Sequence, residues 1–141
     1  LGWVDVLVVN ETEAAGLFGT MDLTRADREA WADRLPALAR ATGWHGRVLV
    51  VTLGAAGSVA LDAGGQVCTA AAPAIEQVDA TGAGDAFGCG FVDALSRGAP
   101  LAEALRRGNL CGAHIAAREG ILAHLPRRQD LAGQSSFKVN R

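Results

Sequence analysis

Two short runs of apolar, mostly β-branched residues constrain the fold of this 141-residue chain most strongly. They extend from Val4 to Val9 and from Val48 to Thr52. Near-continuous apolar runs of this length are typical of strands that are buried on both faces of a parallel sheet. Segments with a helical pattern separate and follow them. This alternation predicts an α/β fold, a three-layer α/β/α arrangement around a mainly parallel sheet in which the two runs are central strands.

Helical segments are expected between and after these strands, each ended by a glycine. Thr24 is the expected N-cap of the second segment. Pro36 should kink or split that segment, because proline removes a backbone N–H and clashes with the preceding turn. The expected helices are Ala14–Phe18, about Arg25–Thr42, about Ala83–Arg97 and about Leu101–Arg118, which are followed by Gly19, Gly43, Gly98 and Gly120.

A β-hairpin is expected after the second strand. The segments Ser58–Asp62 and Gln66–Thr69 have strand character, and Ala63-Gly64-Gly65 between them is a turn signal.

Composition and charge exclude several classes of protein. The formal net charge of −2 gives no electrostatic reason to expect a nucleic-acid partner or an anionic membrane surface. Apolar runs are too short to span a bilayer, and no signal-peptide pattern is present. Cys68, Cys89 and Cys111 lie far apart and form no CxxC pair, so we expect reduced thiols in a cytoplasmic protein.

The start of the chain suggests a piece of a longer protein. Leu1 stands where a methionine is usual, and a strand pattern follows almost at once. We expect one domain over residues 1–133 and a polar tail over residues 134–141.

A glycine-rich segment before the third helix carries the chemistry. Gly82 and Gly84 lack a Cβ, so an anion can approach their backbone N–H groups closely at the start of a helix. Asp85, in the first helical turn, would repel a phosphate but suits a neutral hydroxyl whose proton it accepts. The alternative is a plain turn followed by a helix-start aspartate. The segment is not a Walker A loop, because the GxxxxGK[ST] pattern is absent.

The string Asp79-Ala80-Thr81-Gly82-Ala83-Gly84-Asp85-Ala86-Phe87 closely resembles the C-terminal signature of ribokinase-like (PfkB-type) carbohydrate kinases, D-T-T-G-A-G-D-x-F. The resemblance extends from Val4 to about Leu131, and Ala80 departs from the commoner Thr. It implies ATP-dependent phosphoryl transfer to a hydroxyl of a sugar or sugar acid, with Asp85 as the base.

The resemblance also assigns roles to the residues around Asp85. The amides of Gly82, Ala83 and Gly84 would form the anion hole for the transferred phosphoryl group. Asp79 and Thr81 would help to hold a monovalent cation such as K⁺. ATP and Mg²⁺ are the implied cofactors.

Three further segments match the family in order. Asn10-x-x-Glu13 resembles a motif near Mg²⁺ and the phosphates, where Glu13 would act through water; alternatively it is a helix capping box. Thr52 to Gly57 resembles a T-x-G-x-x-G turn in which Thr52, Gly54 and Gly57 contact the nucleotide, or it is a plain turn after a strand. Asn109 matches a position near the nucleoside, or it is a surface residue of a helix.

Members of this family have an N-terminal half that supplies most of the sugar site and a lid that mediates homodimers, and neither is present here. An edge strand and apolar surface would then be exposed. Two alternatives therefore remain open: a related kinase of a nucleoside or vitamin precursor, and a catalytically silent remnant that only binds nucleotide or a partner.

Overall fold

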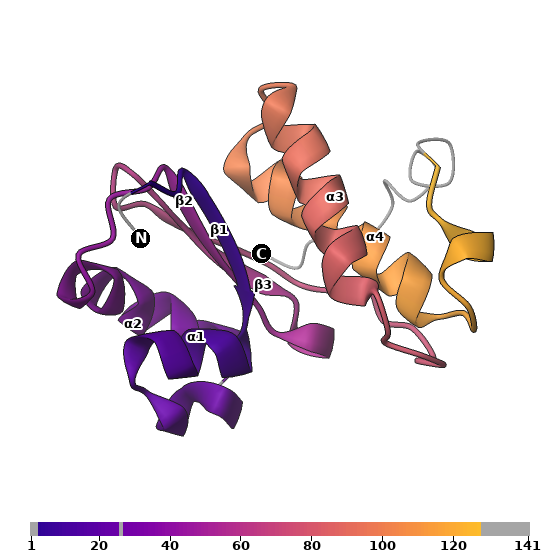
Figure 1. The fold of residues 1–141 in the computed structure, drawn as a ribbon, viewed down its shortest axis with the longest axis horizontal. Helices are drawn as coiled ribbons and strands as arrows, with labels where there is room; N and C mark the ends of the chain where they lie inside the picture. The colour runs from indigo at the N-terminus through magenta and orange to yellow at the C-terminus, as the bar shows by residue number, and fades with distance from the viewer. Residues whose placement is uncertain (1–2, 26, 128–141) are drawn as a thin grey trace. The chain divides into compact units, whose positions relative to one another are not determined.

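The computed structural model describes residues 3–25 and 27–127 (Figure 1). The expected polar tail, residues 134–141, lies outside them. The chain divides into two compact units, one ending at Ala71 and the other beginning at Ala72. Each unit is described by itself below.

The first unit contains a four-stranded sheet with the order β1-β2-β3-β4. Its strands are β1 (Val6–Asn10), β2 (Val48–Thr52), β3 (Ser58–Asp62) and β4 (Val67–Ala70). The β1–β2 pair is parallel, whereas β2–β3 and β3–β4 are antiparallel. The α/β class and the hairpin are thus as expected, but the sheet of the described residues is mixed, because the hairpin extends it in the antiparallel direction.

The two apolar runs occupy different places in this sheet. β2 is central, and its residues Leu49 to Val51 are fully buried. β1 stands at the edge of the sheet, and its residues Val6 to Val9 are only half-buried. The expectation that both runs are central strands is confirmed for β2, and β1 pairs on one side only within the described residues.

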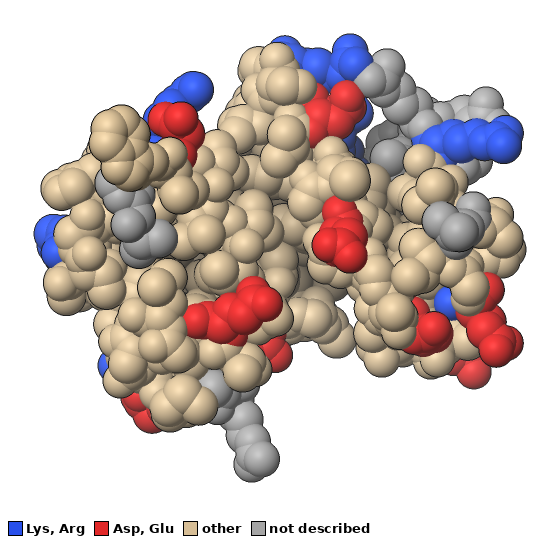
Figure 2. Space-filling view, viewed as in Figure 1, with Lys and Arg blue, Asp and Glu red and all other residues tan. Residues whose placement is uncertain are grey.

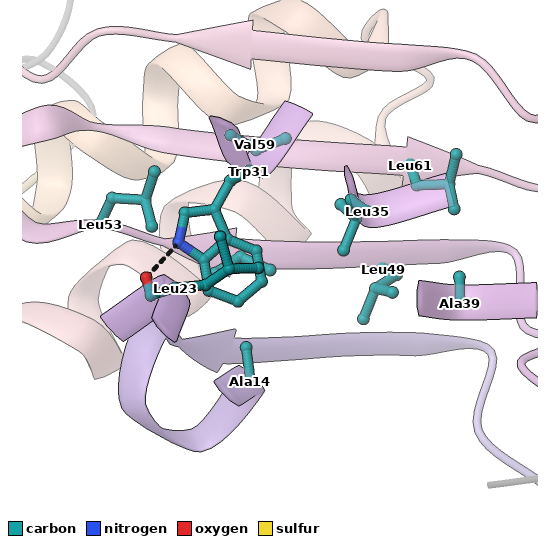
Figure 3. Close-up of a cluster of buried hydrophobic side chains, with 10 residues drawn as sticks. Ala14, Leu23, Trp31, Leu35, Ala39, Leu49, Leu53, Val59 and Leu61 are labelled. Carbon is teal, nitrogen blue, oxygen red and sulfur yellow. Dashed lines mark hydrogen bonds between the residues drawn. The ribbon is translucent and has the colours of Figure 1, made fainter. Parts of the chain in front are cut away.

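Helices α1 (Glu11–Phe18) and α2 (Arg28–Ala41) cover one face of the sheet (Figure 1). The core lies between them and the sheet (Figure 3). Trp31 is fully buried at its centre, and its indole Nε1 donates a hydrogen bond to the carbonyl oxygen of Leu23, 3.1 Å away. The other buried members of this cluster are Ala14, Leu35, Ala39, Leu49, Val51, Leu53, Val59 and Leu61.

The N-cap of α2 differs from the expectation. The helix begins at Arg28 and is capped by Asp27, whose Oδ1 accepts a hydrogen bond of 2.8 Å from the amide of Ala30. The expected cap, Thr24, lies in the preceding 3₁₀ helix η1 (Met21–Arg25). Thr24 and Asp27 are both good capping residues, so side-chain type alone does not choose between them.

Pro36 lies inside α2 and does not split it. Trp31, Leu35 and Ala39 recur every four residues on the face that packs against the sheet, and all three are buried. Burying this row offsets the missing hydrogen bond at Pro36, which ordinarily costs about 3 kcal/mol in a helix interior.

The second unit is built on α3 (Ala83–Ser96) and α4 (Leu101–Ala116), which pack side by side (Figure 1). Glycines let the two helices approach closely. A Cβ on Gly90 would lie 2.5 Å from Sγ of Cys111, and one on Gly108 would lie 2.8 Å from the ring of Phe87. Both helices were expected from the sequence, and they end one or two residues earlier than predicted.

Charged side chains are scattered over the face shown in Figure 2, where acidic and basic residues form small separate groups among uncharged ones. Within the described residues, every helix is too short or too polar to cross a membrane.

Candidate active site

A tight turn leads into α3. The amide of Ala83 donates to the carbonyl oxygen of Ala80 at 3.0 Å, and Gly82 adopts φ 76° and ψ 0°. These angles are those of the third residue of a type II turn, which requires a positive φ and therefore favours glycine. A Cβ on Gly82 would also lie 2.9 Å from Cδ1 of Ile121. Glycine is therefore favoured at position 82 for two physical reasons, the positive φ and the close approach of Ile121.

Two backbone amides in the first turn of α3 have no hydrogen-bond partner among the described residues. The helical ladder starts with the amide of Ala86, which donates to the carbonyl oxygen of Gly82 at 3.0 Å. The amides of Gly84 and Asp85 make no hydrogen bond within the described part of the chain. A Cβ on Gly84 would meet nothing within 4 Å, so the approach to these amides is open. Such a helix start is an anion-binding site.

Of the predicted anion hole of Gly82, Ala83 and Gly84, the amides of Gly82 and Gly84 make no hydrogen bond within the described residues. The amide of Ala83 is engaged in the turn with Ala80. The amide of Asp85 was not predicted as a donor, although counting helix positions from Gly82 would have found it, because it belongs to the third residue of α3.

The carboxylate of Asp85 is exposed in the first turn of α3, where the helix macrodipole stabilises a negative charge. Asp85 also lines a cavity of about 300 Å³ between α3, α4 and the segment that follows α4. Most of the lining is apolar. The other lining residues are Gly82, Ala86, Cys89, Gly90, Asp93, Cys111, Ile115, Ile121, Leu125 and Pro126.

Asp79 and Thr81 form a local turn just before α3. The Oδ1 atom of Asp79 accepts a hydrogen bond of 2.9 Å from the amide of Thr81. The Thr81 side chain first, and then its amide, hold the pKa of Asp79 below its ordinary value. The amides of Val78 and Asp79 donate to the carbonyl oxygen of Ala116, at 2.8 and 3.2 Å, which ties this segment to the end of α4. An ionised Asp79 suits a cation, and its role as a cation ligand stays a prediction.

In the first unit, predicted site residues gather at the carboxyl ends of the parallel strands. Asn10 and Thr52 are register partners at the ends of β1 and β2, and the Thr52 hydroxyl donates to the carbonyl oxygen of Val9 at 3.4 Å. Asn10 and Glu13 form a capping box: Asn10 Oδ1 accepts from the Glu13 amide at 2.8 Å, and Glu13 Oε2 accepts from the Asn10 amide at 2.9 Å. The capping alternative is therefore confirmed, and the metal role of Glu13 is untested.

The T-x-G-x-x-G turn lies at the same edge of the sheet. It contains the 3₁₀ helix η2 (Gly54–Ala56), and Gly54 and Gly57 have φ values of 53° and 98°. A hydrogen bond of 2.8 Å from the amide of Leu53 to the carbonyl oxygen of Gly57 closes it. From outside the turn, Nη1 of Arg28 donates to the carbonyl oxygen of Ala56 at 2.8 Å. Local sequence patterns do not reveal this contact, because Arg28 and Ala56 are 28 positions apart in the chain.

Asn109 lies within α4 and is only 6% exposed. This burial does not fit the alternative of an ordinary surface asparagine. Its predicted place near the nucleoside is untested.

The predicted site residues thus form two groups, one in each unit. Asn10, Glu13, Thr52, Gly54 and Gly57 belong to the first unit. Asp79, Thr81, the residues 82–85 and Asn109 belong to the second. Within the described residues, no cluster of three or more His, Cys, Asp or Glu side chains forms a metal site.

Comparison with known proteins identifies the family. The sequence profile of the pfkB family carbohydrate kinases matches residues 1–128. The chain belongs to the PfkB family. This agrees with the signature at residues 79–87 and with the α/β arrangement described above.

The chain is similar to an aminoimidazole riboside kinase and to a ribokinase. The chain is 36% identical to the aminoimidazole riboside kinase of Salmonella typhimurium over 110 residues, 67% of this chain and 34% of that protein. It is 31% identical to the ribokinase of Haemophilus influenzae over 133 residues, 92% of this chain and 40% of that protein. It therefore spans well under half the length of these relatives.

The fold is ribokinase-like. The structure of Arabidopsis thaliana ribokinase complexed with ribose and ATP matches 95% of this chain with a TM-score of 0.77 and 27% sequence identity, and the match covers 41% of that chain.

Proposed function

We propose that this PfkB chain is the C-terminal, nucleotide-binding part of an ATP-dependent kinase that phosphorylates a hydroxyl of a sugar or sugar acid. The observation that supports this most directly is the start of α3. There, two unpartnered amides, of Gly84 and Asp85, lie in the same helical turn as the exposed Asp85 carboxylate. One turn thus supplies both an anion site and a proton acceptor.

The proposed mechanism assigns a separate role to each group of that turn. The Asp85 carboxylate accepts the proton of the acceptor hydroxyl as its oxygen attacks the γ-phosphorus of ATP. The amides of Gly84 and Asp85 donate to the oxygens of the transferred phosphoryl group, whose negative charge they stabilise. Gly82 fixes the direction of these amides through its left-handed conformation. The anion hole of this proposal is therefore centred on Gly84.

Glu13 is the proposed contact of Mg²⁺. Its carboxylate stands at the carboxyl edge of β1 beside Asn10, and Mg²⁺ prefers oxygen ligands and keeps several waters. This fits a single carboxylate that acts through water, since the described residues contain no multi-ligand metal cluster. When bound, Mg²⁺ neutralises phosphate charge. Asp79 and Thr81 are the proposed contacts of a monovalent cation.

A nucleoside is the second candidate for the acceptor. The relative with 36% identity is a kinase of a riboside, and another relative is a ribokinase. A ribose unit is common to both names, so we propose a ribose-like hydroxyl as the acceptor, either in a sugar or in a nucleoside. Comparing the turnover of ribose with that of ribosides in the complete enzyme separates the two.

The proposed anion site predicts that Gly84→Ala weakens nucleotide binding while the protein stays folded. The added methyl group meets no protein atom within 4 Å, so it occupies space that the phosphates need. Gly88→Ala is a matched control, because Gly88 lies one turn further along α3 and its Cβ would also meet nothing within 4 Å. Calorimetric titration with ATP and ADP should give an affinity lower by about tenfold or more for Gly84→Ala, since a lost charge-assisted contact is worth about 1.5–3 kcal/mol. Equal affinities for the two variants would rule out this phosphate site.

A further inference from the structure

Arg28 makes a contact that no sequence motif explains. It is the first residue of α2, and its Nη1 donates to the carbonyl oxygen of Ala56 at 2.8 Å. Ala56 lies in the T-x-G-x-x-G turn between β2 and β3. The guanidinium therefore links the start of a helix to the turn that the proposed function assigns to the nucleotide.

Local preferences do not account for an arginine at this place. The start of a helix carries a partial positive charge, so a cation in the first turn is unfavourable. The neighbouring acidic residues, Asp27 and Glu29, fit the helix start, whereas Arg28 does not. Arg28 also forms no ion pair within the described residues. Its hydrogen bond to the turn is the interaction that compensates for its position.

The carbonyl group of Ala56 lies where a hydrogen bond can restrict the conformation of the turn. Ala56 is joined to Gly57, and Gly57 adopts φ 98° and ψ −130°, a conformation that glycine alone adopts readily. The other hydrogen bonds of the turn run inside it, from the amides of Leu53, Ala56 and Gly57 to the carbonyl oxygens of Gly57, Leu53 and Gly54. The Ala56–Gly57 peptide group is therefore held at both ends, by Gly54 at the Gly57 amide and by Arg28 at the Ala56 carbonyl.

We propose that Arg28 is a positioning residue that preorganises the nucleotide-binding turn through the carbonyl of Ala56. This inference rests on the proposed function, because it takes the turn to contact the nucleotide. When the guanidinium is removed, the turn samples other conformations, and the nucleotide must order it on binding. The chemical step is untouched, because Arg28 acts on the turn alone.

The test compares Arg28→Ala, Arg28→Lys and Arg40→Ala in the complete kinase. Arg40 is an exposed residue in the last turn of the same helix and serves as the control. We expect Arg28→Ala to speed amide hydrogen exchange at Ala56 and Gly57. We also expect it to raise the KM for ATP by about three- to tenfold with kcat unchanged, the effect of losing one intramolecular hydrogen bond of ordinary strength. Arg28→Lys keeps a charged donor and should recover part of the affinity, and Arg40→Ala should match the parent.

Unchanged exchange and unchanged KM in Arg28→Ala would overturn the inference, as would Arg28→Lys behaving no better than Arg28→Ala. Gly54→Ala distinguishes this failure from a failure of the proposed function. Gly54 has φ 53°, so an alanine there strains the turn directly. If Gly54→Ala raises the KM for ATP and Arg28→Ala does not, only the role of Arg28 is wrong. If neither variant alters the KM, the turn is not a nucleotide contact, and the inference falls together with that part of the proposed function.

Discussion

Gly82 holds a left-handed backbone conformation, with φ 76°, at the residue where α3 begins. We predict that Gly82→Ala lowers the free energy of unfolding of the second unit by about 1–2 kcal/mol, because a Cβ is unfavourable at this φ. The variant should lose further stability because the added carbon would lie 2.9 Å from Ile121. Urea unfolding followed by far-UV circular dichroism measures the change, since Trp3, Trp31 and Trp44 all lie in the first unit and report on it instead.

Gly98→Ala is the control for this prediction. Gly98 has φ 77°, almost the angle of Gly82, but a Cβ there would meet nothing within 4 Å. Gly98→Ala should therefore show the backbone strain without a close side-chain contact. Gly82→Ala should be the more destabilising of the two variants. If Gly82→Ala were as stable as the parent, the described geometry of the turn before α3 would be wrong.

Residues with a local role were readily predicted, and residues with a distant partner were not. The positions of Gly82, Gly84 and Asp85 follow from a turn that leads into a helix, and the four consecutive residues 82–85 reveal such a turn. Arg28 acts on Ala56, and only the folded chain brings the two together. Asp27 was missed for a different reason, because Thr24 offered an equally good cap three residues earlier.

At the level of single elements, Glu103 near the start of α4 should make the free energy of unfolding depend on pH. Two arginines one turn later bind Glu103: Nε and Nη2 of Arg106 at 2.7 and 2.8 Å, and Nε of Arg107 at 3.0 Å. Hydrogen bonds from Arg106 and then Arg107 lower the pKa of Glu103 from 4.5 to about 2. Because the folded pKa is lowered, the stabilisation is complete above pH 4.5 and is lost as the pH falls toward 2.

We therefore predict that Glu103→Gln lowers the free energy of unfolding at neutral pH by about 0.3–1 kcal/mol, the range for partly exposed pairs on one helix. The difference from the parent should shrink below pH 4.5 and vanish near pH 2. Urea unfolding at a series of pH values measures it, with Glu119→Gln, an exposed acid beyond the end of α4, as the control. A difference that does not depend on pH would show that the ion pairs do not supply the stability.

Helices and the hairpin were predicted better than the order of strands. The helix boundaries of α3 and α4 follow from their apolar period and their glycines, which are local signals. Whether a strand is central or at an edge depends on which strands pair with it, and a run of apolar residues does not name its partners. Pro36 gave a misleading signal, because the burial of Trp31, Leu35 and Ala39 outweighs the loss of one backbone hydrogen bond.

At the scale of the whole molecule, the family follows from a nine-residue signature and from the profile that matches residues 1–128. The chain covers 34% and 40% of the aminoimidazole riboside kinase and the ribokinase that it resembles. Its described residues contain the proposed base, the anion site and the nucleotide turn. The described residues do not specify the substrate that delivers the hydroxyl, which is why the family could be predicted from the sequence and the acceptor could not.

The single-turnover rate of phosphoryl transfer in the complete kinase tests the proposed role of Asp85 as the general base. We predict that Asp85→Asn lowers this rate by about two to four orders of magnitude, because the amide keeps the shape of the side chain but accepts no proton. Affinity for ATP should be unchanged or higher, since a negative charge near the phosphates is removed. Asp93→Asn, which alters an acid on α3 that lines the same cavity, should stay within a few-fold of the parent. If Asp85→Asn also kept a rate within a few-fold of the parent while chemistry limited turnover, Asp85 would not be the base.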